Sequence, residues 1–444
     1  MFQKGFHPAI LLLMYAALAL APLGLAAAQG LPARPFQDEF ASSLALVGFS
    51  MMMMEFVLSG RFRRISGRTG IDITMRFHQV IARVLALFIL IHPFLYTLPM
   101  SGSRPWDLTG VSGLNLGGAT FITGGLAWLL LPVFIVLGVF RRDLPYRYET
   151  WRLMHGLGAA LIALLTLHHA LGAGRYSADP ALGAFWIVMT SVALGTLVNV
   201  YILRPLSQLR RPYRVKTIEK VAAKTWDLVI EPKHGTALSF EPGQFVWLTL
   251  DRSPFSITEH PFSISSCPAD RPQLSFTIKE AGDFTNRIGH IPVDARAYID
   301  GPHGHMILPQ DDGVGLTFIA GGVGMAPIMG MLRQLRAKRD PRPLKLIYGN
   351  RAVDQIMYKN ELEDMTRELD MEVHNVLSEP PPGWDGKVGI IDEAMLRQLV
   401  DPGSAAGRMY IVCGPAPMID GVATTLGRLG IPASRILSEK FSYD

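Results

Sequence analysis

The chain is poor in the residues that disulfide-stapled and iron–sulfur proteins need. Only two cysteines, Cys267 and Cys413, occur in 444 residues. Two thiols cannot build a disulfide framework, and they are too few to ligate an iron–sulfur cluster. No calcium-binding loop of the EF-hand type precedes the first apolar run, so we do not expect calcium control through such a domain. The net charge of +5 is modest, and we expect no nucleic-acid partner.

Apolar residues are abundant, at 49% of the chain, and they are unevenly placed. Residues 207–444 read as an ordinary globular sequence, whereas the first half contains six long apolar runs. The runs cover residues 9–28, 40–60, 76–99, 117–140, 151–172 and 182–203. Each is about long enough to cross a bilayer. The first could instead be a secretory signal, with Lys4 as its charged region, but its length favours a membrane helix.

Basic residues are concentrated after the second, fourth and sixth runs. They are Arg61, Arg63, Arg64 and Arg68, then Arg141, Arg142, Arg147 and Arg152, then Arg204, Arg210, Arg211, Arg214 and Lys216. The opposite loops hold only Arg34, Arg104 and Arg175. Because basic loops remain in the cytoplasm, this pattern predicts a multi-pass protein of the cell membrane with both termini cytoplasmic, provided that the first helix is retained.

Histidines recur inside two of the apolar runs. The third run carries His78 and His92, and the fifth carries His155 and the adjacent His168 and His169. His78 and His92 are 14 residues apart, which leaves them about 40° apart around a helix and so nearly on one face. Histidine is costly at membrane depth, and one found there is a functional candidate. Any one of them could also serve only as a hydrogen-bonding group between helices.

The predicted topology makes the third and fifth helices run in the same direction. His78 and His155 then form an inner pair near the cytoplasmic side, and His92 and His168 form an outer pair. Each pair could clamp one haem, with one imidazole from each helix, which gives two haems stacked across the bilayer. Glu55 and Arg83 lie at similar depths, so they form either a buried ion pair or a site where Arg83 meets an inner haem propionate.

The spacing of apolar residues changes in the second half of the chain. Short segments rich in β-branched and aromatic residues predict a small antiparallel barrel over residues 213 to about 308. From residue 313 onward, strands alternate with helices, which is typical of a parallel α/β nucleotide-binding domain. We therefore expect a six-helix membrane bundle at 1–206, an antiparallel β-barrel domain at 207–310 and an α/β domain at 311–444.

Four motifs in this half are suited to phosphates and rings. AGGVGMAP at 320–327 lies between a strand and a helix, where glycines let backbone N–H groups approach a pyrophosphate. CGPAPM at 413–418 closes a later strand of the same sheet. HPFSI at 260–264 can meet an isoalloxazine ring and its phosphate, and GDFT at 282–285 supplies a further turn. Each motif alone is more often an ordinary loop, but their order across adjacent domains is specific.

The whole chain resembles the ferric reductase and NADPH oxidase superfamily, in which a haem-binding membrane domain precedes a ferredoxin-reductase-like module for FAD and NAD(P)H. The resemblance rests on HPFS, GDFT, GGVGMAP, CGP and the ending EKF at 439–441, together with the paired histidines. It implies the haem ligands His78, His92, His155 and His168. The family spacing selects His168, although an ideal helix places His169 closer to the face of His155, so His169 remains an alternative.

The resemblance also implies the residues of the flavin and nucleotide sites. Those expected to bind FAD are His260, Pro261, Phe262, Ser263, Thr277, Lys279, Gly282 and Thr285. Those expected to bind NADPH or NADH are Gly321, Gly322, Gly324, Met325, Arg351, Gly414 and Pro415. Arg351 either meets the 2′-phosphate of NADPH or is an ordinary surface arginine. Phe441 is expected to cover the flavin ring, and Cys413 to form a small polar wall near the nicotinamide rather than a nucleophile.

The implied function is transfer of electrons from cytoplasmic NAD(P)H through FAD and two b-type haems to oxygen or a ferric chelate outside. Two alternatives stay open. The protein could donate electrons to an external protein or to quinone, with a docking surface on the loops at 99–116 and 172–181. It could also be a flavoprotein reductase whose helices only anchor it and bind no haem. The sequence does not decide between NADPH and NADH.

Overall fold

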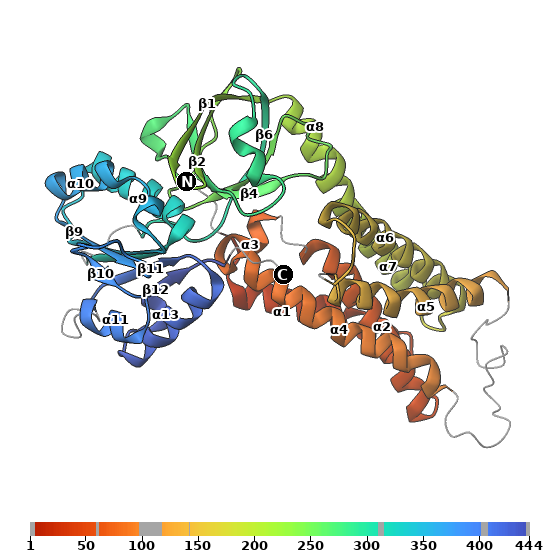
Figure 1. The fold of residues 1–444 in the computed structure, drawn as a ribbon. Coiled ribbons are helices and arrows are strands. Elements are labelled where there is room, and N and C mark those ends of the chain that lie inside the picture. Colours follow the sequence, from red (N-terminus) through yellow and green to blue (C-terminus); the bar gives the residue numbers. More distant parts are fainter. Residues whose placement is uncertain are drawn as a thin grey trace. The chain divides into compact units, whose positions relative to one another are not determined.

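The computed structural model describes residues 5–58, 62–96, 118–141, 143–309, 315–400 and 407–440. It divides into two compact units, Met1–Arg204 and Pro205–Asp444, each with its own hydrophobic core. The first unit is helical, and the second contains two six-stranded sheets (Figure 1). The loop at 99–116, where we expected part of a docking surface, lies outside the described residues.

The first unit is built from long apolar helices. Its helices are α1 (Pro8–Ala28), α2 (Phe36–Leu58), α3 (Arg63–Thr69), α4 (Ile71–Leu95), α5 (Ala119–Val139), α6 (Tyr148–Ala173) and α7 (Pro180–Val198). A π-helical turn at Asn199–Leu203 carries α7 into α8 (Arg204–Leu209). In the described part of the chain, six helices are long and apolar enough to cross a membrane, which confirms the six predicted spans. The short helix α3 was not predicted.

Helix α2 lies at the centre of this bundle. Its run Met51, Met52, Met53 and Met54 is buried, and Phe49 packs against the fully buried Trp186 of α7 with ring centroids 4.6 Å apart. The outer helices instead expose apolar side chains such as those of Leu13 on α1 and Ile122 on α5. An apolar exterior around a packed interior is what a lipid environment requires.

The second unit begins with an antiparallel barrel. Its strands are β1 (Tyr213–Ala222), β2 (Thr225–Pro232), β3 (Phe245–Leu250), β4 (His260–Ser263), β5 (Leu274–Lys279) and β6 (Arg296–His303), in the order β4-β3-β6-β1-β2-β5. A bridge between Ile264 and Phe276 joins the end of β4 to β5, so the first and last strands of the sheet meet. The inward-facing residues form one core that includes Phe276. The predicted antiparallel barrel is confirmed.

A parallel sheet follows the barrel. Its strands are β7 (Leu316–Gly321), β8 (Leu344–Asn350), β9 (Met371–Leu377), β10 (Lys387–Val388), β11 (Met409–Cys413) and β12 (Ile436–Ser438), in the order β10-β9-β8-β7-β11-β12. Helices α9 (Met325–Lys338) and α10 (Lys359–Glu368) cover one face, and α11 (Glu393–Leu399) and α13 (Ala416–Arg428) cover the other (Figure 1). The order reverses between β7 and β11, and ligands bind at such a switch point.

Helix α9 also holds the two sheets together. The missing side chain of Gly330 lets this helix approach the barrel, because a Cβ there would lie 2.9 Å from both the Ile264 and the Ser266 carbonyl oxygens. One turn later, the Arg333 guanidinium donates to the Ser265 carbonyl oxygen at 2.9 Å and to both carboxylate oxygens of Glu361. The barrel and the parallel sheet therefore share a close backbone contact reinforced by the hydrogen bond from Arg333 to the Ser265 carbonyl, and Glu361 of α10 holds that guanidinium in place.

The close contact at Gly330 predicts opposite effects for two glycine-to-alanine changes. Gly330→Ala forces a methyl group against two carbonyl oxygens and should cost about 1–3 kcal/mol. Gly421→Ala, in exposed α13 with no atom within 4 Å of its would-be Cβ, should gain up to about 1 kcal/mol of helix propensity. Thermal unfolding of the full-length protein in detergent checks this pair. Equal midpoints for the two variants would contradict the close contact.

Candidate functional site

Two glycine-rich turns meet at the switch point of the parallel sheet. Gly321, Gly322 and Gly324 follow β7, and Gly414 follows β11. A Cβ on Gly324 would lie 2.3 Å from the Cys413 carbonyl oxygen, and one on Gly414 would lie 3.1 Å from the Gly321 nitrogen. The two turns therefore approach backbone to backbone, and a side chain at Gly324 would overlap the Cys413 backbone.

The start of α9 is open to an anion. The helix begins at Met325 after Gly324, and no side chain caps its first N–H groups. Gly322 has a φ of +52°, in the left-handed region that glycine adopts without strain. Uncapped N–H groups at the start of a long helix suit a pyrophosphate. The structure thus brings together Gly321, Gly322, Gly324, Met325 and, through the neighbouring strand, Gly414.

A buried acid lies beside Cys413, and the predicted site set did not include it. In the register of β11 and β12, Val412 is paired with Ser438, so Glu439 comes directly alongside Cys413. The Glu439 side chain is 1% exposed, and its Oε1 lies 3.4 Å from Nδ1 of His305. Burial, with a further contribution from Glu439, raises the pKa of the Cys413 thiol to about 12. Cys413 is therefore a neutral thiol, which agrees with a wall rather than a nucleophile.

The barrel motifs are joined by aromatic stacking. HPFS forms β4, which pairs with β3 in the register Leu248 with His260. The His260 ring stacks on Phe284 of the GDFT turn, with centroids 4.1 Å apart and planes 19° from parallel. In that turn the Thr285 hydroxyl accepts from the N–H groups of Ala281 and Gly282. The stacking joins β4 to the GDFT turn, so two of the expected flavin segments lie together.

Thr277 and Lys279 lie on β5, and they differ in exposure. The Thr277 side chain is buried, and its hydroxyl contacts Asp227 at 3.2 Å and the Tyr358 hydroxyl. Burial raises the pKa of Asp227 and that of Tyr358. The Thr277 hydroxyl is thus already partnered by the protein, whereas Lys279 is half-buried at the end of the strand, opposite Thr225.

Arg351 follows β8 and lies on the surface. Its Nε donates to Glu379 at 2.8 Å, and both side chains are more than half exposed. An exposed arginine beyond the carboxyl end of a strand remains suited to a 2′-phosphate, although here its partner is an acid. Phe441, expected to cover the flavin, lies outside the described residues.

In the membrane unit, the rings of His78 on α4 and His155 on α6 lie edge to face. Their centroids are 6.5 Å apart and their planes are 76° apart. His155 also stacks on Phe134 and Trp151, with centroids 4.3 and 4.8 Å away, which fixes the orientation of its ring. The predicted inner pair is therefore brought together.

The Nδ1 atom of His78 is held by an acid. It lies 2.6 Å from Oε2 of Glu55 on α2, and the other Glu55 oxygen accepts from the Tyr15 hydroxyl at 3.1 Å. Within the described residues, Glu55 thus contacts His78 and Tyr15 rather than Arg83. Which face of α2 Glu55 occupies depends on the packing of three helices, and the sequence does not show this.

The outer histidines hold their Nδ1 atoms differently. His92 Nδ1 lies 2.7 Å from the Ile89 carbonyl oxygen of its own helix. On α6, His168 Nδ1 lies 2.9 Å from the Thr123 hydroxyl, and His169 Nδ1 lies 2.9 Å from the Thr120 carbonyl oxygen. His168 is exposed and His169 is half-buried with its ring against Gly124. His169 is also close enough to His92 to interact with it electrostatically.

The inner pair fits haem ligation by its ring separation, and His78 and His92 fit it by their hydrogen bonds. Bonds between a metal and an imidazole nitrogen are about 2 Å long, so an iron between two rings separates their centroids by roughly 6 Å, close to the 6.5 Å observed for the inner pair. A ligating histidine also donates its other N–H to a carboxylate or carbonyl, as the bonds of His78 and His92 allow. No cluster of three or more metal-binding side chains occurs among the residues described, and a haem needs only two.

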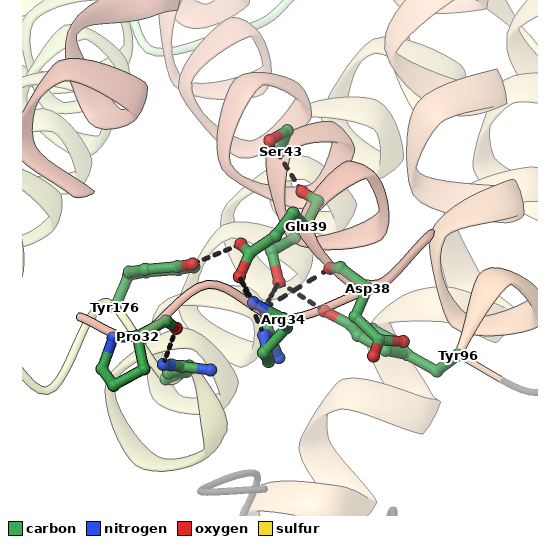
Figure 2. A network of polar contacts seen from close by, with 9 residues as sticks. Pro32, Arg34, Asp38, Glu39, Ser43, Tyr96 and Tyr176 are labelled. Carbon is green, nitrogen blue, oxygen red and sulfur yellow. Dashed lines mark hydrogen bonds and ion pairs between the residues drawn. The ribbon is translucent and has the colours of Figure 1, made fainter. Parts of the chain in front are cut away.

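Polar side chains also gather at the opposite end of α2. Arg34 donates from its backbone N–H and from Nε to Glu39, and Glu39 accepts from the Tyr176 hydroxyl (Figure 2). The Ser42 hydroxyl joins Arg34 to Tyr96, which lies one turn after His92 on α4. This outer network ties the loop after α1 to α2, α4 and the segment after α6.

Family models match three successive parts of the chain. The model described as "Ferric reductase like transmembrane component" matches residues 44–166, the "FAD-binding domain" matches 212–307, and the "Oxidoreductase NAD-binding domain" matches 318–424. The chain is therefore a multi-pass membrane protein with FAD-binding and NAD-binding domains.

Individual relatives match more narrowly. The reductase component of propane 2-monooxygenase from Mycolicibacterium goodii is 28% identical over 50% of this chain and 66% of that protein. NADH-cytochrome b5 reductase 1 from Cryptococcus neoformans var. neoformans serotype D is 28% identical over 38% of this chain and 62% of its own length. The match thus spans less than two thirds of each relative. The solved flavohemoglobin of Malassezia yamatoensis is 19% identical with a TM-score of 0.49, covering 83% of this chain and 98% of that one.

The burial of both thiols predicts that they are inert in the folded protein. Burial also raises the pKa of Cys267. Because each folded-state pKa lies above its ordinary value, neither thiolate forms near neutral pH, and iodoacetamide at about pH 8 should label neither residue. The same protein unfolded in guanidinium should take up two equivalents, one per cysteine. Stoichiometric labelling of Cys413 in the folded protein would contradict the neutral-wall assignment.

Proposed function

Because the chain belongs to the ferric reductase and NADPH oxidase superfamily, we propose that it is an NAD(P)H oxidoreductase of the cell membrane. It takes electrons from NADPH or NADH on the cytoplasmic side and delivers them to a small-molecule acceptor, oxygen or a ferric chelate, on the outer side. The arginine clusters after the second, fourth and sixth spans support this orientation. Bound FAD turns a two-electron donor into single electrons, and two bound b-type haems carry those electrons.

The observation that carries the proposal is the inner pair. His78 and His155 come from different helices, and their rings lie at the separation that one shared metal requires. The Nδ1 atom of His78 is engaged by Glu55, so its Nε2 is the atom left for iron.

The outer pair is His92 with His168. His92 uses Nδ1 on a backbone carbonyl, which leaves its Nε2 for iron. Thr123 donates its hydroxyl hydrogen to the Thr120 carbonyl, so the same oxygen accepts from His168 Nδ1 and leaves Nε2 of His168 free as well. His169 is the rival ligand, because its Nδ1 also meets a carbonyl oxygen and it lies near His92.

The parallel sheet provides the nucleotide side. The uncapped start of α9 binds the pyrophosphate of NAD(P)H, and Gly414 and Pro415 let the nicotinamide approach the flavin edge. HPFS and GDFT, joined by the stacking of His260 on Phe284, hold FAD. Glu439 and neutral Cys413 line the region between the two ligands.

The acceptor side needs no ligand position on the metal. Two imidazoles would hold each iron, so a bound haem would supply electron transfer at its edge rather than a metal site for the acceptor. Oxygen and ferric chelates both suit this outer-edge transfer, which is why the chain's own residues specify the acceptor weakly.

The proposal predicts the haem content of histidine variants. The purified full-length protein should contain two haems per chain, seen as sharp reduced bands. His78→Ala or His155→Ala should remove one haem, and His92→Ala or His168→Ala the other, because one imidazole cannot hold an iron that needs two. Reduction of flavin by NAD(P)H should persist in all four, since the flavin module is untouched.

His169→Ala is the matched control and should retain both haems. Loss of one haem in His169→Ala, with retention in His168→Ala, would move the outer ligand by one residue. A wild-type protein that contains flavin but no haem would refute the proposal and leave a membrane-anchored flavoprotein.

A further inference from the structure

The two histidine pairs differ in the charge of their hydrogen-bond partners. Glu55 is buried at 6% exposure, and its carboxylate lies 2.6 Å from His78 Nδ1. The Tyr15 hydroxyl occupies the other carboxylate oxygen. Three helices, α1, α2 and α4, thus converge on one acid whose main partner is a ligand of the inner pair.

The outer histidines meet neutral partners. The Nδ1 atoms of His92 and His169 meet backbone carbonyl oxygens, and that of His168 meets a threonine hydroxyl. A carboxylate that accepts the Nδ1 proton makes an imidazole a stronger donor to its metal than a carbonyl or a hydroxyl does. His78 is therefore a more electron-rich ligand than the outer histidines.

Charge at the outer end of α2 is balanced. Asp38, Glu39 and Arg34 lie there (Figure 2). Arg175 donates to the Pro32 carbonyl oxygen of the adjoining loop. Arg34 bonds directly to Glu39, and Arg175 lies over the Tyr176 ring that bonds to the same acid. Glu55 instead has a tyrosine and a histidine as its partners. In a medium of low dielectric constant, an acid without a cationic partner acts strongly on its neighbours.

We propose that Glu55 is a positioning residue that fixes the His78 ring with Nε2 toward the iron and holds the inner haem at a lower reduction potential than the outer haem. This proposal rests on the two-haem function above. A negative charge beside the ligand favours the oxidised, more positive iron, so it lowers the potential of the nearer haem more than that of the farther one. Electron flow from the inner haem to the outer one is then downhill.

A redox titration tests this directly. Anaerobic spectroelectrochemistry of the full-length protein in detergent should show two one-electron steps for the haem bands. Glu55→Gln keeps the shape of the side chain and removes its charge. The lower of the two midpoint potentials should then rise toward the higher one, and the higher one should stay in place. The low-temperature paramagnetic resonance signal of one oxidised haem should change as well, because its ligand donates less.

For two further variants we expect a shift in the opposite direction and no shift, respectively. Tyr15→Phe removes the hydroxyl that shares the carboxylate, so more negative charge falls on His78 and the lower step should move downward. Glu39→Gln makes the same chemical change 16 residues earlier on α2, beside Arg34 rather than a histidine, and should move neither step toward the other. If the Glu55→Gln variant loses the inner haem, Tyr15→Phe tests the proposal instead. A downward shift of the lower potential supports the role of Glu55, and an unchanged or higher potential overturns it.

The outcomes separate the two proposals. Two haems whose potentials stay unchanged in Glu55→Gln and Tyr15→Phe would overturn the role of Glu55 and leave the two-haem function standing. A wild-type protein without haem would end both. Equal shifts in Glu55→Gln and Glu39→Gln would show a general effect of charge on α2 and would also overturn the specific role of Glu55.

Discussion

The membrane unit depends on one constraint, which is that a polar group at membrane depth must be satisfied by another group. The structure meets this constraint at His78 by turning the buried Glu55 of α2 toward it, with Tyr15 of α1 on the far oxygen. The central position of α2, packed through its methionines and Phe49, makes this possible, because an acid on a lipid-facing helix would be far more costly. The same bonds leave Nε2 of His78 free, so one arrangement meets the folding requirement and leaves a nitrogen available for the proposed iron.

A second constraint acts in the other unit, where two backbones must touch. Gly324 and Gly414 bring the turns after β7 and β11 into contact at the switch point, and Gly330 brings α9 against the barrel. Glycine at these places lets the nucleotide turns and the flavin motifs belong to one compact unit. The buried Glu439 beside Cys413 follows from the same geometry, since β12 runs parallel to β11 and ends next to it.

The sequence predicted what depends on local pattern. Six apolar runs gave six membrane helices, and alternating patterns gave the barrel and the parallel sheet, because hydrophobic period and length are read residue by residue. It missed α3, which is short and basic, and it missed β10 and β12, which have two and three residues. Elements this short have too few residues to show a hydrophobic period.

Contacts between distant elements were harder to predict. The sequence could not show which side chain bonds to Glu55, because the depth of a residue along a helix does not fix the direction in which it points. Thr277 fitted a flavin motif, yet its hydroxyl is taken by Asp227 and Tyr358, which lies 81 residues away in the chain. Glu439 was visible in the ending EKF, but only the strand order places it beside Cys413. The choice between His168 and His169 depends on helix rotation in the same way.

We propose that electrons pass from nucleotide through flavin to histidine-bound haem within one chain. The most direct test of this electron path is an anaerobic stopped-flow absorbance record of the detergent-purified protein mixed with NADPH or NADH. We expect flavin bleaching to come first and sharp reduced haem bands then to grow at the expense of the reduced flavin. Admission of oxygen or a ferric chelate should then reoxidise the haem. Flavin bleaching with no haem bands, or haem bands that never respond to the nucleotide, would contradict it.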